Sequence, residues 1–474
     1  MKHRTLPLLL LALVAAAASP APQTRSERMT LYVDGALAGT SISLDEPLPD
    51  GGWRLTRQAN LKVRRGEQEL SLRSESVSEV DADLTPRRFR YVRDEASGRL
   101  VHEGTVACQG KGAQRKCIAK VEIHLDGSTT PRTVELPAEG TVAAALEVRV
   151  RRELKDGATY RGEVLVEELA GLAPSSYRVR KEKDGFVVES ELMGVKTVER
   201  LDASGKLLRS EVPLMNLIAV PEGAPPPAGA QGIALDVLAR STWDAPELPS
   251  GVKRVRFELK ARGDGELSAV PQDRRQRVLR QEKGRMLVEV VREPSGVVEV
   301  LTPKERERAL AATPYEPVGD PRIVEAARKA RGKASTPREI VKALTLWVHR
   351  TVSRKDLSRA YAPATATLQS RQGDCTEHSV LLSALLKASG IPARLVDGVI
   401  AFESKLGYHE WVEAYLDGEG WVPVDPTFGE PVAGPNRVKF ITGSSDPSDL
   451  MAMGLSAAQA FRGLTVSIEG FDEK

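Results

Sequence analysis

The chain has 474 residues, of which 68 are basic and 65 acidic, so its formal net charge is +3. This length predicts two to four domains of roughly 100–200 residues each, and the 41% hydrophobic and 28% charged contents are typical of globular proteins. A charge so close to balance gives no reason to expect nucleic acid or an anionic membrane as a partner.

Residues 1–18 are predicted to be a signal peptide. Lys2 and Arg4 form a basic start, an apolar run follows, and Ala16 and Ala18 satisfy the small-x-small cleavage rule. The apolar run is shorter than the roughly 20 residues of a spanning helix, although an uncleaved N-terminal anchor is the alternative. We therefore expect an exported protein, periplasmic or extracellular, without an integral membrane segment after cleavage.

Two of the three cysteines lie close together in the sequence. Cys108 and Cys117 flank a turn in TVACQGKGAQRKCIAKVEI, a stretch typical of a two-stranded hairpin. In an oxidising compartment we expect a disulfide that closes this hairpin, with two free thiols as the alternative. Cys375 is then left over, and a leftover thiol in an exported protein is a candidate reactive group.

Residues 24–220 are predicted to form an antiparallel β accessory domain. Short runs of alternating apolar and polar residues recur through it, separated by turn signals such as DG and DASGK. One predicted strand is ALEVRVRREL, at residues 145–154. A Pro- and Gly-rich linker follows at 221–232, and a second, smaller β unit is expected at 233–304.

Helix signals mark residues 305–445 as a third domain, of α+β type. In the segment PRIVEAARKARG, Ile323, Val324 and Ala327 are expected to share the buried face of a helix. Three predicted strands follow later in the same domain, in ARLVDGVIAF, HEWVEAYLDG and GWVPVDPTF. The C-terminal tail, 446–474, is expected to contain a helix and a last strand.

Two helices of the third domain have clear start signals. Thr336 precedes Pro337 and is followed three residues later by Glu339, which is the pattern of a capping box. The other helix, CTEHSVLLSALLKASG, begins at Cys375 and is expected to end at Gly390.

The position of Cys375 at a helix start favours a reactive thiolate. The free N–H groups and the positive end of a helix stabilise an anion, and they lower a thiol pKa from about 8.5 into a range of roughly 3.5–7.5. The same N–H groups can stabilise the oxyanion of a tetrahedral intermediate. The alternative is a small cysteine buried in the core.

His409 and Asp425 are the candidate partners of the thiol. His409 opens a predicted strand, with Trp411 on the same face, and Asp425 ends the return strand just before Pro426. The hairpin register between the two is offset, so the spacing alone does not pair them. A nucleophile, a base and an orienting carboxylate are together what thiol acyl transfer needs.

At these residues the sequence resembles the transglutaminase-like superfamily, with its papain-like thiol catalytic core. The resemblance covers about residues 320–442, and the β region before it resembles the accessory region of some exported bacterial members. The matching blocks are GDC at 373–375, IPARLVDGVIAF at 391–402, HEWVEAYL at 409–416 and GWVPVDPT at 420–427.

The resemblance implies that Cys375 is the nucleophile, His409 the base and Asp425 the orienter of a cysteine protease, amidase or transglutaminase. It would act on peptide or protein amides and pass the acyl group to water or to an amine. Gln369, six residues before the cysteine, is a candidate oxyanion donor. We expect no cofactor and no metal, and we regard a zinc site with His378 as a poor alternative. A non-catalytic envelope protein that binds partners through its β region is the competing hypothesis.

Overall fold

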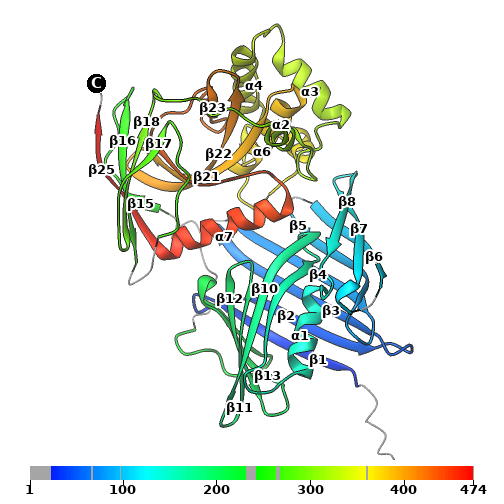
Figure 1. Cartoon of the computed structure of the whole chain (residues 1–474). Helices are drawn as coiled ribbons and strands as arrows, with labels where there is room; N and C mark the ends of the chain where they lie inside the picture. Colours follow the sequence, from blue (N-terminus) through cyan, green and yellow to red (C-terminus); the bar gives the residue numbers. More distant parts are fainter. Residues whose placement is uncertain are drawn as a thin grey trace, which may run out of the picture.

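The structure is a computed structural model that describes residues 23–65, 68–96, 98–110, 112–230, 242–262, 267–358 and 361–472. The predicted signal peptide at 1–18 and the end of the predicted linker lie outside the described residues. A large antiparallel β region is followed by a mixed α/β region (Figure 1), which confirms the predicted fold class.

The N-terminal region is one antiparallel sheet of fourteen strands in its described part. Strands that are neighbours in sequence are nearly always neighbours in the sheet, and β1 joins the two halves by pairing with β14. In sheet order the strands are β8 (Ser128–Leu136), β7 (Lys116–Leu125), β6 (Gly98–Gln109), β5 (Pro86–Glu95), β4 (Gln68–Val80), β3 (Trp53–Arg65), β2 (Ala36–Pro47), β1 (Arg25–Val33), β14 (Leu217–Pro221), β13 (Leu207–Val212), β12 (Val195–Asp202), β11 (Gly185–Leu192), β10 (Gly171–Glu182) and β9 (Thr159–Val166).

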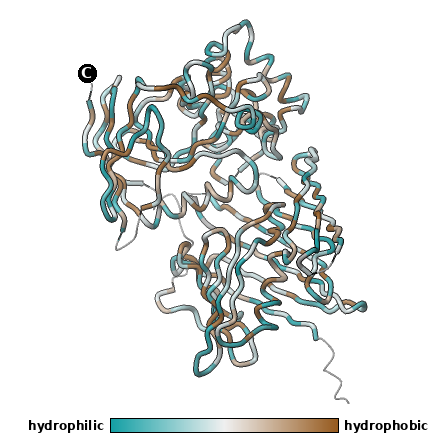
Figure 2. The backbone as a smooth tube through the Cα atoms, in the orientation of Figure 1, coloured by the Kyte–Doolittle hydropathy of each residue, from teal (hydrophilic) through white to brown (hydrophobic). Residues whose placement is uncertain are grey.

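The sheet is strongly curled. Its two outermost strands, β8 and β9, contact each other, and Val142 forms a bridge with Leu165 of β9. Successive side chains of a strand point to opposite faces, so the alternating sequence gives an inner and an outer surface. Figure 2 shows the resulting alternation of hydrophobic and hydrophilic residues along these strands.

The prediction of a strand at residues 145–154 was wrong, because this segment lies mostly in helix α1 (Ala143–Arg152). The run of Val and Arg residues alternates as a strand would, but three alanines precede it and alanine is the best helix former. Ala144, Ala145 and Val148 are buried, as are Leu146 and Val150, and these spacings fit a helix.

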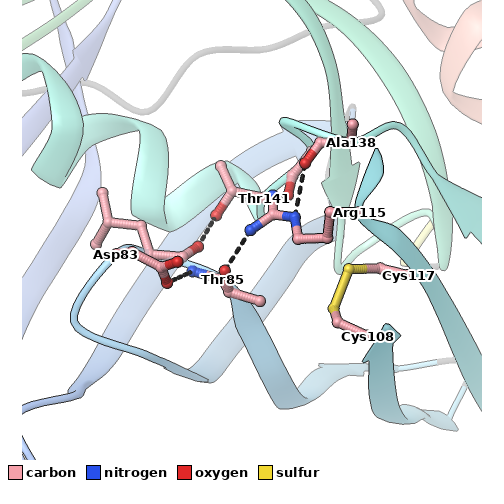
Figure 3. Close-up of a disulfide and its surroundings, with 9 residues drawn as sticks. Asp83, Thr85, Cys108, Arg115, Cys117, Ala138 and Thr141 are labelled. Atoms are coloured by element: carbon pink, nitrogen blue, oxygen red, sulfur yellow. Dashed lines mark hydrogen bonds between the residues drawn. A yellow bond between two sulfur atoms is a disulfide. The ribbon is translucent and has the colours of Figure 1, made fainter. Parts of the chain in front are cut away.

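Cys108 and Cys117 form a disulfide between β6 and β7 (Figure 3). The two residues are direct partners in the ladder, and their Cα atoms are 4.1 Å apart. Arg115, in the loop before β7, donates a hydrogen bond of 2.6 Å from Nε to the Ala138 carbonyl and another to the Thr85 hydroxyl. The loop is therefore fixed both by the disulfide and by the Arg115 guanidinium.

The described part of the C-terminal region contains three smaller sheets. One has the order β15-β22-β21-β24, with β23 paired to β22, and a second has the order β17-β18-β16-β25. The third is a short parallel pair, β19 and β20. The strands are β15 (Thr242–Asp244), β16 (Arg254–Ala261), β17 (Gln276–Glu282), β18 (Arg285–Val291), β19 (Arg354–Lys355), β20 (Gln372–Gly373), β21 (Ala393–Phe402), β22 (Lys405–Leu416), β23 (Gly420–Val424), β24 (Arg437–Gly443) and β25 (Leu464–Asp472).

The C-terminal tail supplies the predicted helix and strand, and β25 pairs with β16 of the second β unit. Among the described residues, no helix is both long enough and apolar enough to cross a membrane. The helices are α2 (Pro303–Leu310), α3 (Pro321–Arg331), α4 (Pro337–Thr351), α5 (Ala364–Ser370), α6 (Cys375–Ala388) and α7 (Pro447–Gly463), with 3-10 turns η1 (Gly112–Gln114) and η2 (Pro213–Met215).

The helix signals read from the sequence hold in most details. Thr336 caps α4 with the predicted capping box, in which Glu339 is the reciprocal partner. In α3 the buried residues are Ile323, Ala326 and Ala327, whereas Val324 is exposed, so that part of the predicted face was wrong. An i, i+3, i+4 stripe that starts at Ile323 includes Ala326 and Ala327 but leaves Val324 on the solvent side.

The two regions share one hydrophobic core. Leu55 and Ile123 of the N-terminal sheet belong to the same buried cluster as Ile323 of α3, Leu344 of α4 and Leu381 of α6. Figure 1 shows the helical part standing above the strands β5–β8. Hydrogen bonds of Arg93 to Tyr315 and of Thr365 to Asp126 cross the same boundary.

We expect the double variant Cys108→Ser, Cys117→Ser to lower the free energy of unfolding by about 2–3 kcal/mol, because the disulfide restricts a short loop in the unfolded chain. Urea unfolding under oxidising conditions measures the difference. Wild-type protein treated with a reductant should unfold at the urea concentration of the double variant. Equal stability of oxidised wild type and variant would contradict the prediction.

Candidate active site

Cys375 is the first residue of α6, and a capping box holds it there. The Asp374 carboxylate accepts a hydrogen bond of 2.9 Å from the Thr376 amide, and the Glu377 carboxylate accepts one of 2.8 Å from the Asp374 amide. Asp374 is thus the helix N-cap. The Cys375 thiol is outside the disulfide and half-buried, at the positive end of the helix.

His409 and Asp425 are in direct contact. His409 lies on β22 and Asp425 directly follows β23, and both side chains are buried. His409 Nε2 is 2.7 Å from Asp425 Oδ2. The other ring nitrogen, Nδ1, is therefore the one that can exchange a proton with another group.

The register of the β22–β23 hairpin explains how Asp425 reaches His409 although the two residues are not opposite each other. Val412 of β22 is opposite Val424 of β23, so continuation of the ladder would place Asp425 opposite Trp411. Trp411 and His409 are two residues apart and share a face of the strand. Because Asp425 lies just beyond the strand end, its carboxylate reaches the His409 ring diagonally. The His409 ring is also flanked by Trp411 and Phe428, with ring centroids 6.2 and 5.4 Å away.

A buried arginine also holds the Asp425 carboxylate. Arg437, the first residue of β24, donates from Nη2 at 2.7 Å and from Nε at 3.0 Å to Asp425 Oδ2, and its side chain is nearly inaccessible. Asp425 Oδ1 accepts hydrogen bonds from the amides of Thr427 and Phe428. Burial alone would raise the pKa of Asp425, but the charges of His409 and Arg437 and their hydrogen bonds hold it well below its usual range.

A further buried ion cluster stands beside this one. Glu413, on the His409 face of β22, pairs with Arg394 of β21 at 2.6 Å and with Lys439 of β24 at 2.7 Å. Burial opposes ionisation of Glu413, but the two cations lower its pKa to about 2. These ion pairs join β21, β22 and β24 behind the candidate site.

On the other face of β22, two carboxyl groups meet. Asp397 of β21 and Glu410 of β22 are direct partners in the ladder, and both are buried. Each leaves one carboxyl oxygen without a donor from another described residue, as expected if the two groups share a proton. Burial raises the pKa of Asp397 to about 7, while the pKa of Glu410 is raised by burial and by the charge of Asp397.

Tyrosines enclose this carboxyl pair. Tyr361 donates a hydrogen bond of 2.5 Å to Glu410, and Tyr408 is hydrogen-bonded to Asp397. Burial first, and then the charges of Asp397 and Glu410, raise the pKa of Tyr408 well above its ordinary value, and the Cys375 charge adds to this effect. The cluster therefore lies near enough to the candidate nucleophile for the charge of Cys375 to act on the half-buried Tyr408.

Of the remaining sequence candidates, only His378 has contacts that define a structural role. His378 is buried with Nδ1 2.6 Å from the Asp374 carbonyl and Nε2 3.1 Å from the Val352 carbonyl, so it ties α6 to α4. Burial lowers its pKa, and no group of metal-ligating side chains is found among the described residues. Gln369 is exposed on α5 and has no side-chain hydrogen bond to a described residue, so it remains only a prediction.

Sequence analysis missed Arg437. The segment RVKF alternates charged and apolar residues, which is typical of a strand with a solvated face. In the structure both cations, Arg437 and Lys439, are buried and each faces carboxylates. The signal was two cations on one face of a strand in the matched region, together with two carboxylates, Glu413 and Asp425, that needed counterions.

A family model matches the part of the chain that contains the candidate site. Residues 324–426 match the family model of the transglutaminase-like superfamily. Similar solved structures include a candidate cysteine protease from Cytophaga hutchinsonii, with 18% identity, a TM-score of 0.30 and coverage of 49% of this chain and 86% of that chain. Another is the periplasmic domain of TgpA from Pseudomonas aeruginosa, bound to ethylmercury, with 21% identity, a TM-score of 0.29 and coverage of 40% and 77%. No curated protein sequence matches the chain significantly.

The Asp397–Glu410 pair predicts a pH-dependent stability. The ordinary pKa of Asp397 is 3.8 and its folded value is about 7. The folded state therefore keeps a proton that the unfolded chain releases, so this stabilisation is full below about pH 4 and is lost as the pH rises through about 7. In Asp397→Asn, the decline of the unfolding free energy between pH 5 and 8 should be shallower than in wild type.

Urea unfolding at pH 5, 6, 7 and 8 measures this slope. Asp417→Asn is the matched control, because the Asp417 side chain is 77% exposed and its removal should leave the wild-type slope. Parallel curves for wild type and Asp397→Asn would contradict the shared proton.

Proposed function

Residues 324–426 form a domain of the transglutaminase-like superfamily, and we propose that the protein is a thiol enzyme with Cys375 as nucleophile, His409 as general base and Asp425 as the orienting carboxylate. The observation that carries this proposal is the buried 2.7 Å contact between His409 and Asp425, within a matched domain whose cysteine begins a helix. These are the parts that nucleophilic acyl transfer requires.

The proposed reaction begins with attack on a peptide or protein amide. The Cys375 thiolate adds to the carbonyl carbon, while the backbone amide of Cys375 at the helix end is the donor proposed for the oxyanion. His409, protonated at Nδ1, then gives its proton to the leaving amine nitrogen as the C–N bond breaks. The product is a thioester at Cys375, and water or a second amine cleaves it while His409 accepts the proton of the attacking group.

The electrostatics of Asp425 suit the orienting role. An ionised carboxylate that accepts the hydrogen bond of Nε2–H fixes the tautomer in which Nδ1 is the basic nitrogen. The same carboxylate stabilises the imidazolium once the thiol has given up its proton. Arg437 keeps Asp425 ionised under acidic conditions as well. Its second carboxylate contact, to Glu430 at 2.9 Å, holds the guanidinium in place.

We propose that the enzyme works outside the cytoplasm. The disulfide Cys108–Cys117 supports this, because such bonds persist in oxidising compartments. The predicted signal peptide supports it from the sequence. Substrates would then be exported proteins or peptides, and the acyl acceptor separates a protease or amidase from a transglutaminase.

We expect Cys375→Ser to reduce turnover at least about 1,000-fold, because a serine hydroxyl is far less ionised than a thiol. His409→Ala should be nearly as damaging, and Asp425→Asn should leave more residual activity, with a loss of about 10²–10⁴-fold. Because the three act as a unit, the losses should not add. Mass spectrometry of a peptide library, with and without an added amine, measures turnover and identifies the acceptor.

Matched controls exist for two of these variants. His124→Ala removes a half-exposed histidine of β7, in the N-terminal sheet, and Asp417→Asn removes an exposed carboxylate, so both should retain wild-type turnover. Circular dichroism checks that every variant folds. The proposal fails if Cys375→Ser processes any substrate at the wild-type rate.

Arg437 gives a separate prediction about pH. Arg437→Met removes a positive charge from Asp425, so the pKa of Asp425 rises and the acidic limb of the activity profile should move to higher pH. In Arg437→Lys the acidic limb should lie between those of wild type and Arg437→Met, since lysine keeps the positive charge but lacks the two-nitrogen contact of arginine. An unchanged acidic limb in Arg437→Met would show that Asp425 ionisation does not control activity.

A further inference from the structure

The N-terminal sheet encloses a cavity of about 480 Å³. Its lining comes from α1 and from strands on both sides of it, and the known lining lies wholly between Ser41 and Leu201, outside the transglutaminase-like domain. Helix α1 contacts β3 and β9, and Figure 1 shows it within the curve of the sheet. The volume falls in the range of small-molecule binding sites, which is roughly 300–1,000 Å³.

Small polar residues on the inner face keep this space open. Reading across the ladders, Ser43 is opposite Arg57, Arg57 is opposite Ser76, and Ser76 is opposite Tyr91. All four residues line the cavity. Serine at these inward positions fills much less volume than the Val, Leu or Ile of a packed core. The Ser76 hydroxyl oxygen is buried and has no hydrogen-bond partner among the described residues.

The arginines of the cavity are already neutralised. Arg57 pairs with Asp45 and Glu147, both at 2.8 Å, and Arg151 pairs with Glu27 at 2.6 Å. An anionic ligand would have to compete with these carboxylates, so the two guanidiniums do not form an anion site.

Glu199 is different, because it lines the cavity without forming an ion pair to any described residue. Burial and the nearby charges of Glu147 and Glu27 raise the pKa of Glu199 to about 7, although Arg151 and Arg57 oppose the shift. Glu199 is thus a carboxyl group of the cavity that a bound cation would stabilise in its ionised form.

An aliphatic wall stands next to this carboxyl group. Leu201 is two residues from Glu199 on the same face of β12, and Leu146 and Val150 of α1 also line the cavity. Val164 of β9 completes the wall. A ligand with an aliphatic chain and a positively charged end would bury its chain here and place the charge at Glu199.

We propose that the cavity of the N-terminal sheet binds an aliphatic primary amine, with its ammonium group at Glu199 and its alkyl chain against Leu146, Val150 and Leu201. The amine can be a free alkylamine or the side chain of a lysine in a peptide. This site is separate from Cys375, so it stands or falls independently of the proposed thiol chemistry.

Calorimetric titration of the full chain at pH 8 tests the site, with n-hexylamine, n-hexanol and n-hexanoate as probes. We expect n-hexylamine to bind at least ten-fold more tightly than the other two, because only it carries the positive charge. Acetyl-Gly-Lys-Gly-amide against its norleucine analogue tests the lysine source. Binding of either amine supports the site and identifies the source, whereas equal binding of hexanol and hexylamine, or no binding of either amine, overturns it.

Glu199→Gln should weaken n-hexylamine binding at least ten-fold and remove the preference over n-hexanol. Glu189→Gln is the matched control, since Glu189 lies on the neighbouring strand β11, is 57% exposed and should leave binding unchanged. Unaltered hexylamine binding in a folded Glu199→Gln variant overturns the assignment.

A measurement on wild type needs no variant. The charges that act most strongly on Glu199 are those of Glu147 and Arg151 on α1, Glu27 on β1 and Arg57 on β3. The arginines keep their charge at these pH values, and Glu147 and Glu27 are held in ion pairs. The other carboxyl groups that line the cavity are Glu167, Glu168 and Glu191. Hexylamine binding should therefore weaken as the pH falls from 8 to 6 and Glu199 takes up a proton, and pH-independent binding would contradict the proposal.

Discussion

The buried carboxylate of Asp425 is the interaction on which the arrangement of the C-terminal domain depends. It accepts hydrogen bonds from a histidine of β22, an arginine of β24 and two backbone amides of its own loop. A buried charge is tolerated only when its partners satisfy it, and loss of one partner of such a pair typically costs about 3–5 kcal/mol. The carboxylate therefore couples the positions of three strand segments, and it sets the orientation of the His409 ring.

Helix α6 is fixed to the same framework by polar contacts along its length. At its start, Glu377 is bonded to the Asp374 and Ala362 amides, and further along Ser379 donates to the Glu410 carbonyl of β22. Near its end Lys387 forms a fully buried ion pair with Glu316. These contacts restrict sliding of α6 against β22, so the cysteine at its first position and the histidine on the strand are held by one network.

The sequence predicted the elements of this domain well because their signals are local. Capping residues, the apolar stripe of α6 and the alternation of β21 and β22 depend on neighbours within a few residues. Arg437 could not be recognised in this way, since its partners are 7 and 12 residues away across a loop and a sheet. Helix α2 was missed although Thr302, Pro303 and Glu305 form a capping box, because none of its residues is buried and no apolar stripe marks it. Residues 145–154 were predicted as a strand because Val and Arg alternate there. They lie mostly in helix α1 instead, where the helix packs its apolar side chains against both halves of the curled sheet.

The alternation of inward and outward side chains has opposite results in the two regions. In the C-terminal domain, inward charges such as Glu413 of β22 and Lys439 of β24 meet across the intervening strand β21, so the space between them is filled by ion pairs. In the N-terminal sheet, Ser43, Arg57 and Ser76 line up on the inner face. Arg57 is paired with Asp45, and the small serine side chains leave the space open. Because both regions contribute to one hydrophobic core through Ile123 and Leu381, the open cavity and the closed ionic cluster belong to a single folded unit. The aliphatic wall of the cavity, formed by Leu146, Val150, Val164 and Leu201, belongs to a second hydrophobic cluster within the N-terminal sheet. Unfilled space lowers stability, so selection for stability alone would favour larger side chains at the inward serine positions.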